Sequence, residues 1–217
     1  MGIKFSIIIT VYNQLNFIQP CLCMLKEQTC TDFEVILIDN ASTDGGRIFI
    51  EQLNVATFPF PIIKMVNPQN VGLCKAFNQG LRVAIGKYVI DLSPDDYFAP
   101  NKLLNNYKLM QKHKAKILFS NCYVEQEHTT FLHSDKYTFT YQGFGNYFEQ
   151  VVQRHCLAAC TGVYDRQLVN KLGGYQESLA YEDFDFITRA TYRNNLVYDP
   201  EALMTKGEKT VGWSAQF

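Results

Sequence analysis

The sequence lacks an excess of charge of either sign. Its 20 lysines and arginines are balanced by 21 aspartates and glutamates, so the formal net charge is −1. Proteins that bind nucleic acid present a basic face, and segments that bind anionic lipid carry clusters of basic residues. The charge balance therefore indicates no nucleic-acid partner and argues against tight binding to an anionic membrane.

Long hydrophobic runs are also missing. The first apolar stretch ends at Val11, far short of the roughly 20 residues that a membrane-spanning helix needs. No small-residue cleavage site follows it, as a signal peptide would require. The next residues are uncharged but largely polar, and include Asn13, Gln14, Asn16, Gln19 and Pro20. We expect a buried strand followed by a helix, and no transmembrane segment.

The cysteines lack the spacing of a metal site. The chain has seven, an odd number, with no C-x-x-C pair. Most lie in apolar surroundings, which is typical of reduced thiols that serve as small core residues. Because disulfide frameworks belong to oxidising compartments, this usage favours a cytoplasmic protein. The seven are Cys21, Cys23, Cys30, Cys74, Cys122, Cys156 and Cys160.

Two glycine-rich nucleotide-binding motifs are absent as well. No G-x-G-x-x-G follows the first apolar run, and no G-x-x-x-x-G-K-[ST] occurs anywhere in the chain. These absences argue against a dinucleotide-binding Rossmann domain and against a P-loop enzyme.

Apolar and aromatic side chains are abundant. Apolar residues make up 47% of the 217 residues, which is enough for one good core. In the first half, β-branched runs alternate with segments of helical spacing, and we expect strands at 5–11, 33–39, 62–66 and 88–92. This alternation predicts an α/β fold with a mostly parallel central sheet.

The second half is less regular. We expect a helix after Pro100, and then a strand, a loop or hairpin, a helix, a strand and two helices. Their ranges are 117–124, 125–146, 147–155, 157–164, 165–172 and 182–192. In the last helix, the spacing predicts that Phe184, Ile187 and Ala190 face inward.

In parallel sheets, ligands bind beyond the carboxyl ends of the strands. The residues after the first two expected strands include Thr10, Tyr12, Asn13 and Asp39. A tyrosine ring can pack on a nucleotide base, and a strand-end carboxylate can accept hydrogen bonds from a base N–H or a ribose hydroxyl. The same residue types also serve as helix caps and in turns, so both interpretations stay open.

A second group, Asn70-Val-Gly72, opens an expected helix that carries Lys75 and Asn78. A helix N-terminus beside a lysine suits an anion such as a diphosphate. The alternative is an ordinary capped helix with a surface lysine.

Two acidic groups complete the candidates. Ser93-Pro-Asp-Asp96 follows the fourth expected strand, and its adjacent carboxylates suit a hard divalent cation. An acidic turn that caps the next helix explains them equally well. Glu182 and Asp183 begin an expected helix, where the helix dipole favours acidic residues. Their functional interpretation is a general base, which must lie within hydrogen-bond reach of the proton it removes.

Taken in order, these segments resemble the family 2 glycosyltransferases. The resemblance covers roughly residues 3–192 and is densest over the first hundred. The runs that carry it are Ser6-Ile-Ile-Ile-Thr-Val-Tyr-Asn13, Val35-Ile-Leu-Ile-Asp-Asn-Ala-Ser-Thr-Asp-Gly45, Asn70-Val-Gly72, Asn78-Gln-Gly80, Gly86-Lys-Tyr-Val-Ile-Asp-Leu-Ser-Pro-Asp-Asp96, Gly173-Gly-Tyr175 and Glu182-Asp183.

The resemblance implies the GT-A fold and an enzyme that transfers a sugar, with inversion, from a nucleotide-diphosphate donor. It implies UDP as the carrier and a hydroxyl of a glycan or lipid-linked acceptor, in polysaccharide or cell-surface glycan synthesis. It also implies one domain, residues 1–217, with a donor half at 1–99 and an acceptor half at 100–217. Membrane association, if it occurs, is expected to be peripheral and through partners.

The resemblance also assigns residues. Asp183 matches the carboxylate taken as the catalytic base, with Glu182 beside it. Asp95 and Asp96 fall on the end of the family's D-x-D motif, which implies Mg²⁺ or Mn²⁺. The implied donor-binding residues are Thr10, Tyr12, Asn13, Asp39, Asn70, Gly72, Lys75, Asn78, Ser93 and Asp95.

The chain departs from the family pattern at two points. Ser93 stands where the motif has its first aspartate, and a hydroxyl supplies no charge to a metal. All four histidines precede Asp183, so the late metal-binding histidine of many members has no counterpart. These departures favour the main alternative, a non-catalytic protein on the same fold that binds nucleotide sugars.

Two further alternatives remain. A nucleotidyltransferase normally needs a basic, glycine-rich loop after the first strand, and residues 12–16 contain neither glycine nor charge. An α/β interaction module without a small-molecule site is the third possibility.

Overall fold

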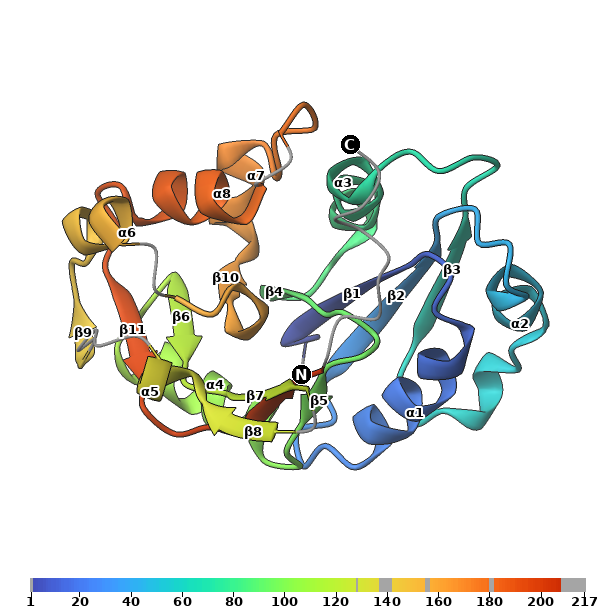
Figure 1. The fold of residues 1–217 in the computed structure, drawn as a ribbon, viewed down its shortest axis with the longest axis horizontal. Coiled ribbons are helices and arrows are strands. Elements are labelled where there is room, and N and C mark those ends of the chain that lie inside the picture. The colour runs from blue at the N-terminus through green and yellow to red at the C-terminus, as the bar shows by residue number, and fades with distance from the viewer. Residues whose placement is uncertain (1, 128, 137–141, 155–156, 180–181, 208–217) are drawn as a thin grey trace.

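The computed structural model describes residues 2–127, 129–136, 142–154, 157–179 and 182–207. Two sheets form its framework (Figure 1), and the larger has the strand order β3-β2-β1-β4-β10-β6-β11-β9. Its strands are β1 (Phe5–Val11), β2 (Phe33–Asp39), β3 (Ile62–Val66), β4 (Tyr88–Asp91), β6 (Ile117–Ser120), β9 (Gly143–Gly145), β10 (Val163–Asp165) and β11 (Leu196–Asp199). The smaller sheet has the order β5-β12-β7-β8, from β5 (Tyr97–Phe98), β7 (Tyr123–Gln126), β8 (Thr129–Leu132) and β12 (Met204–Lys206).

The helices are α1 (Leu15–Lys26), α2 (Gly46–Gln52), α3 (Leu73–Val83), α4 (Lys102–Lys112), α5 (His133–Lys136), α6 (Phe148–Arg154), α7 (Arg166–Leu172) and α8 (Glu182–Thr191). Two short 3₁₀ helices, η1 (Val55–Thr57) and η2 (Ala159–Thr161), complete the described elements.

The large sheet is mostly parallel, as predicted. Strand β1 pairs in parallel with both β2 and β4, and β2 pairs in parallel with β3. Strands β10 and β9 run against their neighbours. The register sets Val11 opposite Asp39, so the carboxyl ends of β1 and β2 lie together. Every residue of β1 and β2 is buried, which explains their continuous apolar runs.

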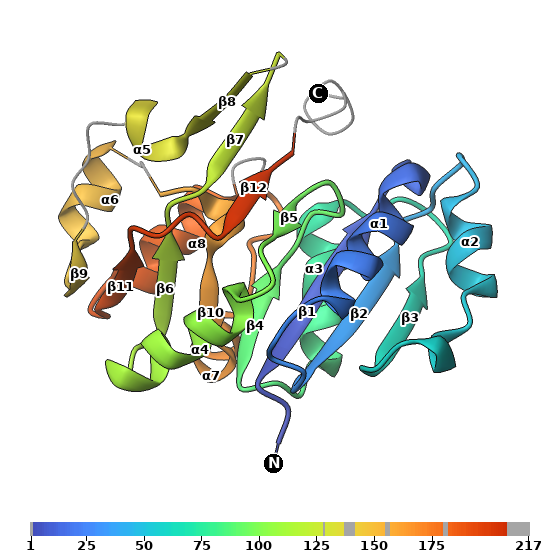
Figure 2. The ribbon, with the colours of Figure 1, turned by 90° about the horizontal axis from the view of Figure 1, so that it is seen from below.

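Helices cover both faces of this sheet (Figure 2). Helices α1, α2 and α4 pack on one face, against side chains such as Ile7 and Ile9 of β1. Helices α3, α6, α7 and α8 pack on the other face, in the apolar cluster that includes Ile8 of the same strand. Since alternate residues of a strand point to opposite faces, β1 contributes to two cores at once.

The small sheet brings distant segments to the acidic turn after β4. Strand β12 pairs with β5, which begins directly after Asp96, and also with β7. The backbone N–H of Gly207 then donates to Asp96 Oδ1 at 3.2 Å. A Cβ at Gly207 would lie 2.1 Å from the carbonyl oxygen of Asp95, so only glycine fits this close approach.

Three predictions for the second half are wrong in detail. The strand expected at 117–124 breaks after Ser120, because Asn121 Oδ1 accepts hydrogen bonds from the backbone N–H groups of Cys122 and Ser134. Residues 117–120 and 123–126 therefore lie in different sheets. The strand expected at 157–164 begins only at Val163, after η2. Strands β5, β11 and β12 were not predicted.

The third concerns helix α8. Phe184 was expected to face inward, but 37% of its surface is exposed, and Phe186 fills the core position instead. Helix α6 occupies most of the range expected for it, and His155, the end of that range, lies outside the described residues.

Within the described ranges, no helix combines the length and hydropathy of a membrane span. The six cysteines in those ranges are free thiols, and Cys156 lies outside them.

Candidate active site

The loops after β1 and β2 are joined to each other. The backbone N–H of Asn13 donates to Ser42 Oγ at 3.0 Å, and Asn13 Oδ1 accepts from the Thr43 N–H at 2.8 Å. Asn13 has a φ of +54° and Ala41 one of +66°, both in the left-handed region. Such backbone strain in non-glycine residues is common at binding sites. The two loops thus form one preorganised surface.

Asp39 lies beneath this surface and is 0% exposed. Its carboxylate accepts hydrogen bonds from the backbone N–H groups of Ala41 and Ser42, at 3.1 and 3.2 Å. Asp44, part of the run after β2 that carries the family resemblance, accepts from the backbone N–H groups of Leu15 and Gly46 at the starts of α1 and α2. Both carboxylates therefore hold the loop in place.

An asparagine cluster fixes the approach to α3. Asn40 donates from Nδ2 to Asn70 Oδ1 at 2.9 Å, and its own Oδ1 accepts from Asn67 Nδ2 and from the Val71 N–H, each at 3.1 Å. Asn70 Oδ1 also accepts from the Gly72 N–H at 2.9 Å. Neither Asn40 nor Asn67 was singled out from the sequence as a donor-binding residue, although each directly follows a strand: Asn40 follows the fully buried β2 and Asn67 follows the half-buried β3.

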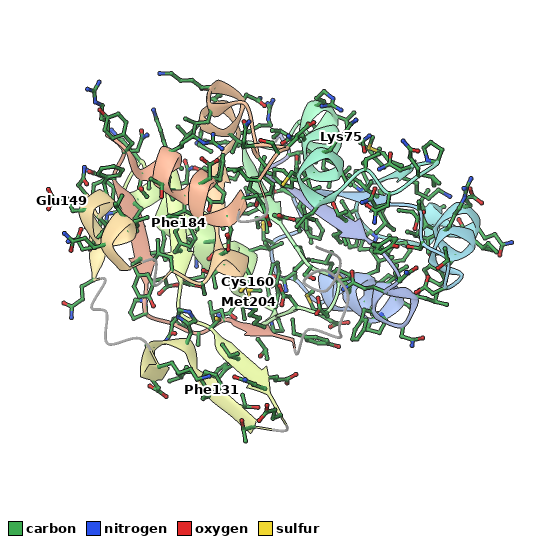
Figure 3. The ribbon with its side chains drawn as sticks, turned by 45° about the horizontal axis from the view of Figure 1, so that its top comes forward. Lys75, Phe131, Glu149, Cys160, Phe184 and Met204 are labelled. Atoms are coloured by element: carbon green, nitrogen blue, oxygen red, sulfur yellow. The ribbon has the colours of Figure 1, made fainter. Side chains whose placement is uncertain are left out.

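The predicted residues of α3 face different ways. Lys75 is exposed near the start of the helix (Figure 3), one turn after Gly72. Asn78 is only 6% exposed and is bonded to the turn after α7. It donates to the Tyr175 carbonyl oxygen at 2.9 Å and accepts from the Tyr175 N–H at 3.0 Å. Asn78 therefore joins α3 to the segment that precedes α8.

Thr10 lies below the surface of the site. It is 5% exposed, and its hydroxyl oxygen is buried without a hydrogen-bond partner in the described part of the chain. Tyr12, two residues on, is partly exposed.

The two carboxylates of the acidic turn, Asp95 and Asp96, differ in exposure. Asp95 is partly exposed and accepts a hydrogen bond from Ser93 Oγ. Asp96 is 4% exposed, and burial, together with nearby Cys160 and Asp95, raises the pKa of its carboxyl well above the usual value. Asp95 is thus the accessible carboxylate.

This oxygen-rich pair fits Mg²⁺ or Mn²⁺, which take carboxylate and hydroxyl oxygens and keep water or phosphate oxygens elsewhere. In the ranges that the structure describes, no three His, Cys, Asp or Glu side chains gather as a metal site. Phosphate oxygens of a donor would have to complete the coordination.

The acidic pair Glu182 and Asp183 forms the first turn of α8. Asp183 Oδ1 accepts from the Phe184 N–H at 2.7 Å. Glu182 is close enough to Asp91 and Cys74 to raise the pKa of both side chains. Because Asp91 ends β4 and Cys74 begins α3, the start of α8 lies beside the carboxyl ends of the parallel strands.

Asp91 and Tyr175 were not predicted as site residues. The Tyr175 hydroxyl donates to Asp91 Oδ2 at 2.9 Å. Burial raises the pKa of Asp91 to about 7, with a further contribution from Glu182. The available signal was an aspartate inside an apolar strand run, Tyr88-Val-Ile-Asp-Leu92.

A hollow of about 540 Å³ lies elsewhere, between α1 and the small sheet. Its lining includes Met24, Phe98, Tyr123 and Met204, and it contains none of the predicted site residues. The predicted site residues therefore lie outside this hollow.

Comparisons with known proteins identify the family of this chain. The sequence profile of the family described as Glycosyl transferase family 2 matches residues 6–173. An uncharacterized glycosyltransferase of Rickettsia conorii is 30% identical over 182 residues, which cover 83% of this chain and 28% of that protein. The Escherichia coli enzyme WfaP, named UDP-Glc:alpha-D-GlcNAc-diphosphoundecaprenol beta-1,3-glucosyltransferase, is 31% identical over 122 residues, which cover 56% of this chain and 47% of that protein. The chain thus spans half or less of the length of these relatives.

Two solved structures share the fold. S. aureus TarS 1-349 in complex with UDP-GlcNAc has a TM-score of 0.76 at 19% identity, over 99% of this chain and 61% of that one. The mannosyltransferase PcManGT from Pyrobaculum calidifontis, in complex with GDP-Man and Mn²⁺, has a TM-score of 0.76 at 18% identity, over 98% and 59%. At these identities the likeness establishes the fold alone. The family profile and the relatives establish the rest: the chain belongs to glycosyltransferase family 2 and has the GT-A fold.

Proposed function

We propose that this chain transfers a sugar from a nucleotide-diphosphate donor to a hydroxyl of a glycan or lipid-linked acceptor. The donor that we propose is a UDP-sugar. One observation carries the proposal. The joined loops after β1 and β2, the start of α3 and the Ser93–Asp96 turn share one edge of the sheet, and Glu182 of α8 lies beside it. The UDP-Glc and diphosphoundecaprenol in WfaP's name, and the UDP-GlcNAc bound to TarS, support the donor and the acceptor class.

The donor would lie across the strand ends. Tyr12 and Asn13 would contact the base, and Asp39 would hold the loop that receives the ribose. The N–H groups at the start of α3 and the Lys75 ammonium would neutralise the diphosphate. Asn70 and Gly72 would place that helix start, and Asn78 would tie it to the catalytic segment.

Asp95, helped by Asp96, would hold Mg²⁺ or Mn²⁺, and the Ser93 hydroxyl would contact the donor's ribose. A divalent ion bound there would supply charge neutralisation to the departing nucleoside diphosphate. The Mn²⁺ in PcManGT supports this role.

Asp183 would act as the base. As the acceptor oxygen attacks the anomeric carbon, its proton passes to the Asp183 carboxylate, and the bond from that carbon to the diphosphate oxygen breaks. In-line attack from the opposite side inverts the anomeric centre. Glu182 would flank the base. Residues 1–99 would then serve as the donor half of a single domain and residues 100–217 as the acceptor half, in a cytoplasmic protein that reaches membrane acceptors through partners.

A mutation tests the base. We expect Asp183→Asn to lower transfer about 10²–10⁴-fold, because it removes the proton acceptor. UDP binding, measured by calorimetry, should change little. The matched control is Asp135→Asn, an acidic residue in the first turn of α5, which should transfer normally. Near wild-type turnover in Asp183→Asn would contradict the assignment.

The second candidate is a non-catalytic nucleotide-sugar-binding protein, favoured by Ser93 in place of an acidic ligand. Slow hydrolysis of UDP-sugars without an acceptor separates the two functions. An enzyme should release sugar at a rate that falls in Asp183→Asn, whereas a pure binder should release none.

A further inference from the structure

The segment before the catalytic carboxylates is fastened at several points. Arg189 of α8 donates to the carbonyl oxygens of Leu172 and Gly174, each at 3.0 Å, and forms an ion pair with Asp185 at 2.6 Å. Asn78 bonds to the backbone of Tyr175 from the side of α3. These contacts hold the backbone of the turn between α7 and α8.

The Tyr175 side chain joins three elements. Its ring stacks on Phe77 of α3, with centroids 4.4 Å apart, and meets Phe186 of α8 edge-on at 5.3 Å. Its hydroxyl reaches β4 and donates to Asp91 Oδ2. This one side chain therefore links the helix that would receive the diphosphate, the strand that leads to the acidic turn, and the helix that presents Asp183.

Asp91 is an unexpected partner for this hydroxyl. The titratable groups that face it are Tyr175, Glu182, Cys74 and Tyr164, from the turn, α8, α3 and β10. An asparagine would accept the same hydrogen bond without the free-energy penalty of a desolvated carboxylate. An ionisable group at such a position points to a role in function.

We propose that Tyr175 and Asp91 are positioning residues that set the start of α8, and with it Asp183, against the donor end of the sheet. This inference rests on the proposed function, since Asp183 is its base. Neither residue needs to touch the reacting atoms. Ionised Asp91 accepts a stronger, charge-assisted hydrogen bond from Tyr175 than a neutral group would.

The first test is Tyr175→Phe, which keeps the ring stack and removes the hydroxyl. We expect kcat to fall about ten- to hundredfold with KM for the donor nearly unchanged, because small displacements of a catalytic group have effects of this size. The matched control is Tyr88→Phe at the other end of β4, whose hydroxyl accepts from Gln111 Nε2 at 2.6 Å. A kcat in Tyr175→Phe within twofold of that control would overturn the proposal.

The second test is Asp91→Asn, which keeps an acceptor oxygen and removes the charge. Wild-type kcat should decline as pH falls through about 7, where Asp91 gains a proton. In Asp91→Asn this acid limb should disappear, and the rate at pH 8 should fall less than in Tyr175→Phe. An unchanged acid limb near pH 7 in Asp91→Asn would contradict the role of Asp91.

Hydrogen exchange measured by mass spectrometry separates this inference from the proposed function. Tyr175→Phe and Asp91→Asn should each speed exchange of the amides at 182–186 and leave those at 5–11 unchanged, relative to Tyr88→Phe. If wild type transfers no sugar but this pattern holds, the proposed function fails and the positioning contact stands. Unchanged exchange at 182–186 would overturn the contact itself.

Discussion

At the scale of single residues, environment decides which polar side chains matter. Asp91 is one of 21 acidic residues. Its pKa is raised to about 7 because burial removes water from its carboxylate. Asn40 likewise acts as the centre of a hydrogen-bond cluster because it is fully buried at a strand end. Residue type alone shows neither property.

The raised pKa of Asp91 makes stability depend on pH. Its folded-state pKa of about 7 exceeds the ordinary value of 3.8. Between those values the folded protein holds a proton that the unfolded chain has lost, so stability falls as pH rises through this interval. Asp91→Asn abolishes this loss. We expect its melting temperature to exceed that of wild type by a few degrees at pH 8, where each kcal/mol is worth about 2–4 °C.

At pH 5 most of this difference should vanish, because wild-type Asp91 is then protonated. Asp135→Asn, at an exposed position, serves as the control and should show no such pH-dependent gap. An equal melting temperature for Asp91→Asn and wild type at pH 8 would contradict the assigned burial penalty.

At the scale of elements, the sequence predicts long periodic segments and fails where short strands pair over long distances. The runs at 5–11 and 33–39 were predictable because a strand buried on both faces reads as continuous apolar residues. Strands β5 and β12 have two and three residues, and pair across more than 100 positions. No local sequence pattern predicts a pairing between segments so far apart.

The site residues also divide into those that local sequence predicts and those that depend on long-range contacts. The loops after β1 and β2 were predictable, since carboxyl ends of parallel strands meet at one edge. The Asp91–Tyr175 bond was not, because it joins residues 84 positions apart. Asn78 was expected near the donor, and the structure shows its side chain bonded to Tyr175. Whether these residues bind donor stays a prediction.

The turn after α7 allows a matched test of how α3 holds it. Gly173 and Gly174 have φ values of +80° and +73°, so alanine is strained at both, by about 1–2 kcal/mol. A Cβ at Gly173 meets open space, whereas one at Gly174 would lie 2.2 Å from Asn78 Oδ1. Gly174→Ala should therefore also break the Asn78 contacts, which should lower the free energy of unfolding by about 1–3 kcal/mol more than Gly173→Ala does.

Urea denaturation of the two variants measures this difference in the free energy of unfolding. Gly173→Ala supplies the backbone penalty alone, so subtraction isolates the contact with Asn78. Equal losses in the two variants would show that the turn can move away from α3 without penalty.

At the scale of the whole molecule, one sheet runs through both halves of the chain. Strands β10, β6 and β11 continue the sheet of β1–β4, and β12 returns to the acidic turn after β4. The proposed donor and base residues therefore attach to a common framework rather than to two hinged bodies. A ligand that binds at the strand ends should stabilise the fold as a unit.

This leads to a prediction for nucleotide and metal. A ligand at 100 times its Kd stabilises a protein by about 2.7 kcal/mol, which corresponds to about 5–10 °C for a chain of this size. We expect UDP with Mn²⁺ to raise the melting temperature more than UDP alone. Asp95→Asn should lose the Mn²⁺-dependent part of that shift and keep the remainder, because Asp95 is the accessible carboxylate of the turn. Asp135→Asn should respond as wild type does. An equal shift with Mn²⁺ and with excess chelator would show that the Ser93–Asp96 turn binds no metal together with UDP. Lys75 and the start of α3 would then neutralise the diphosphate instead.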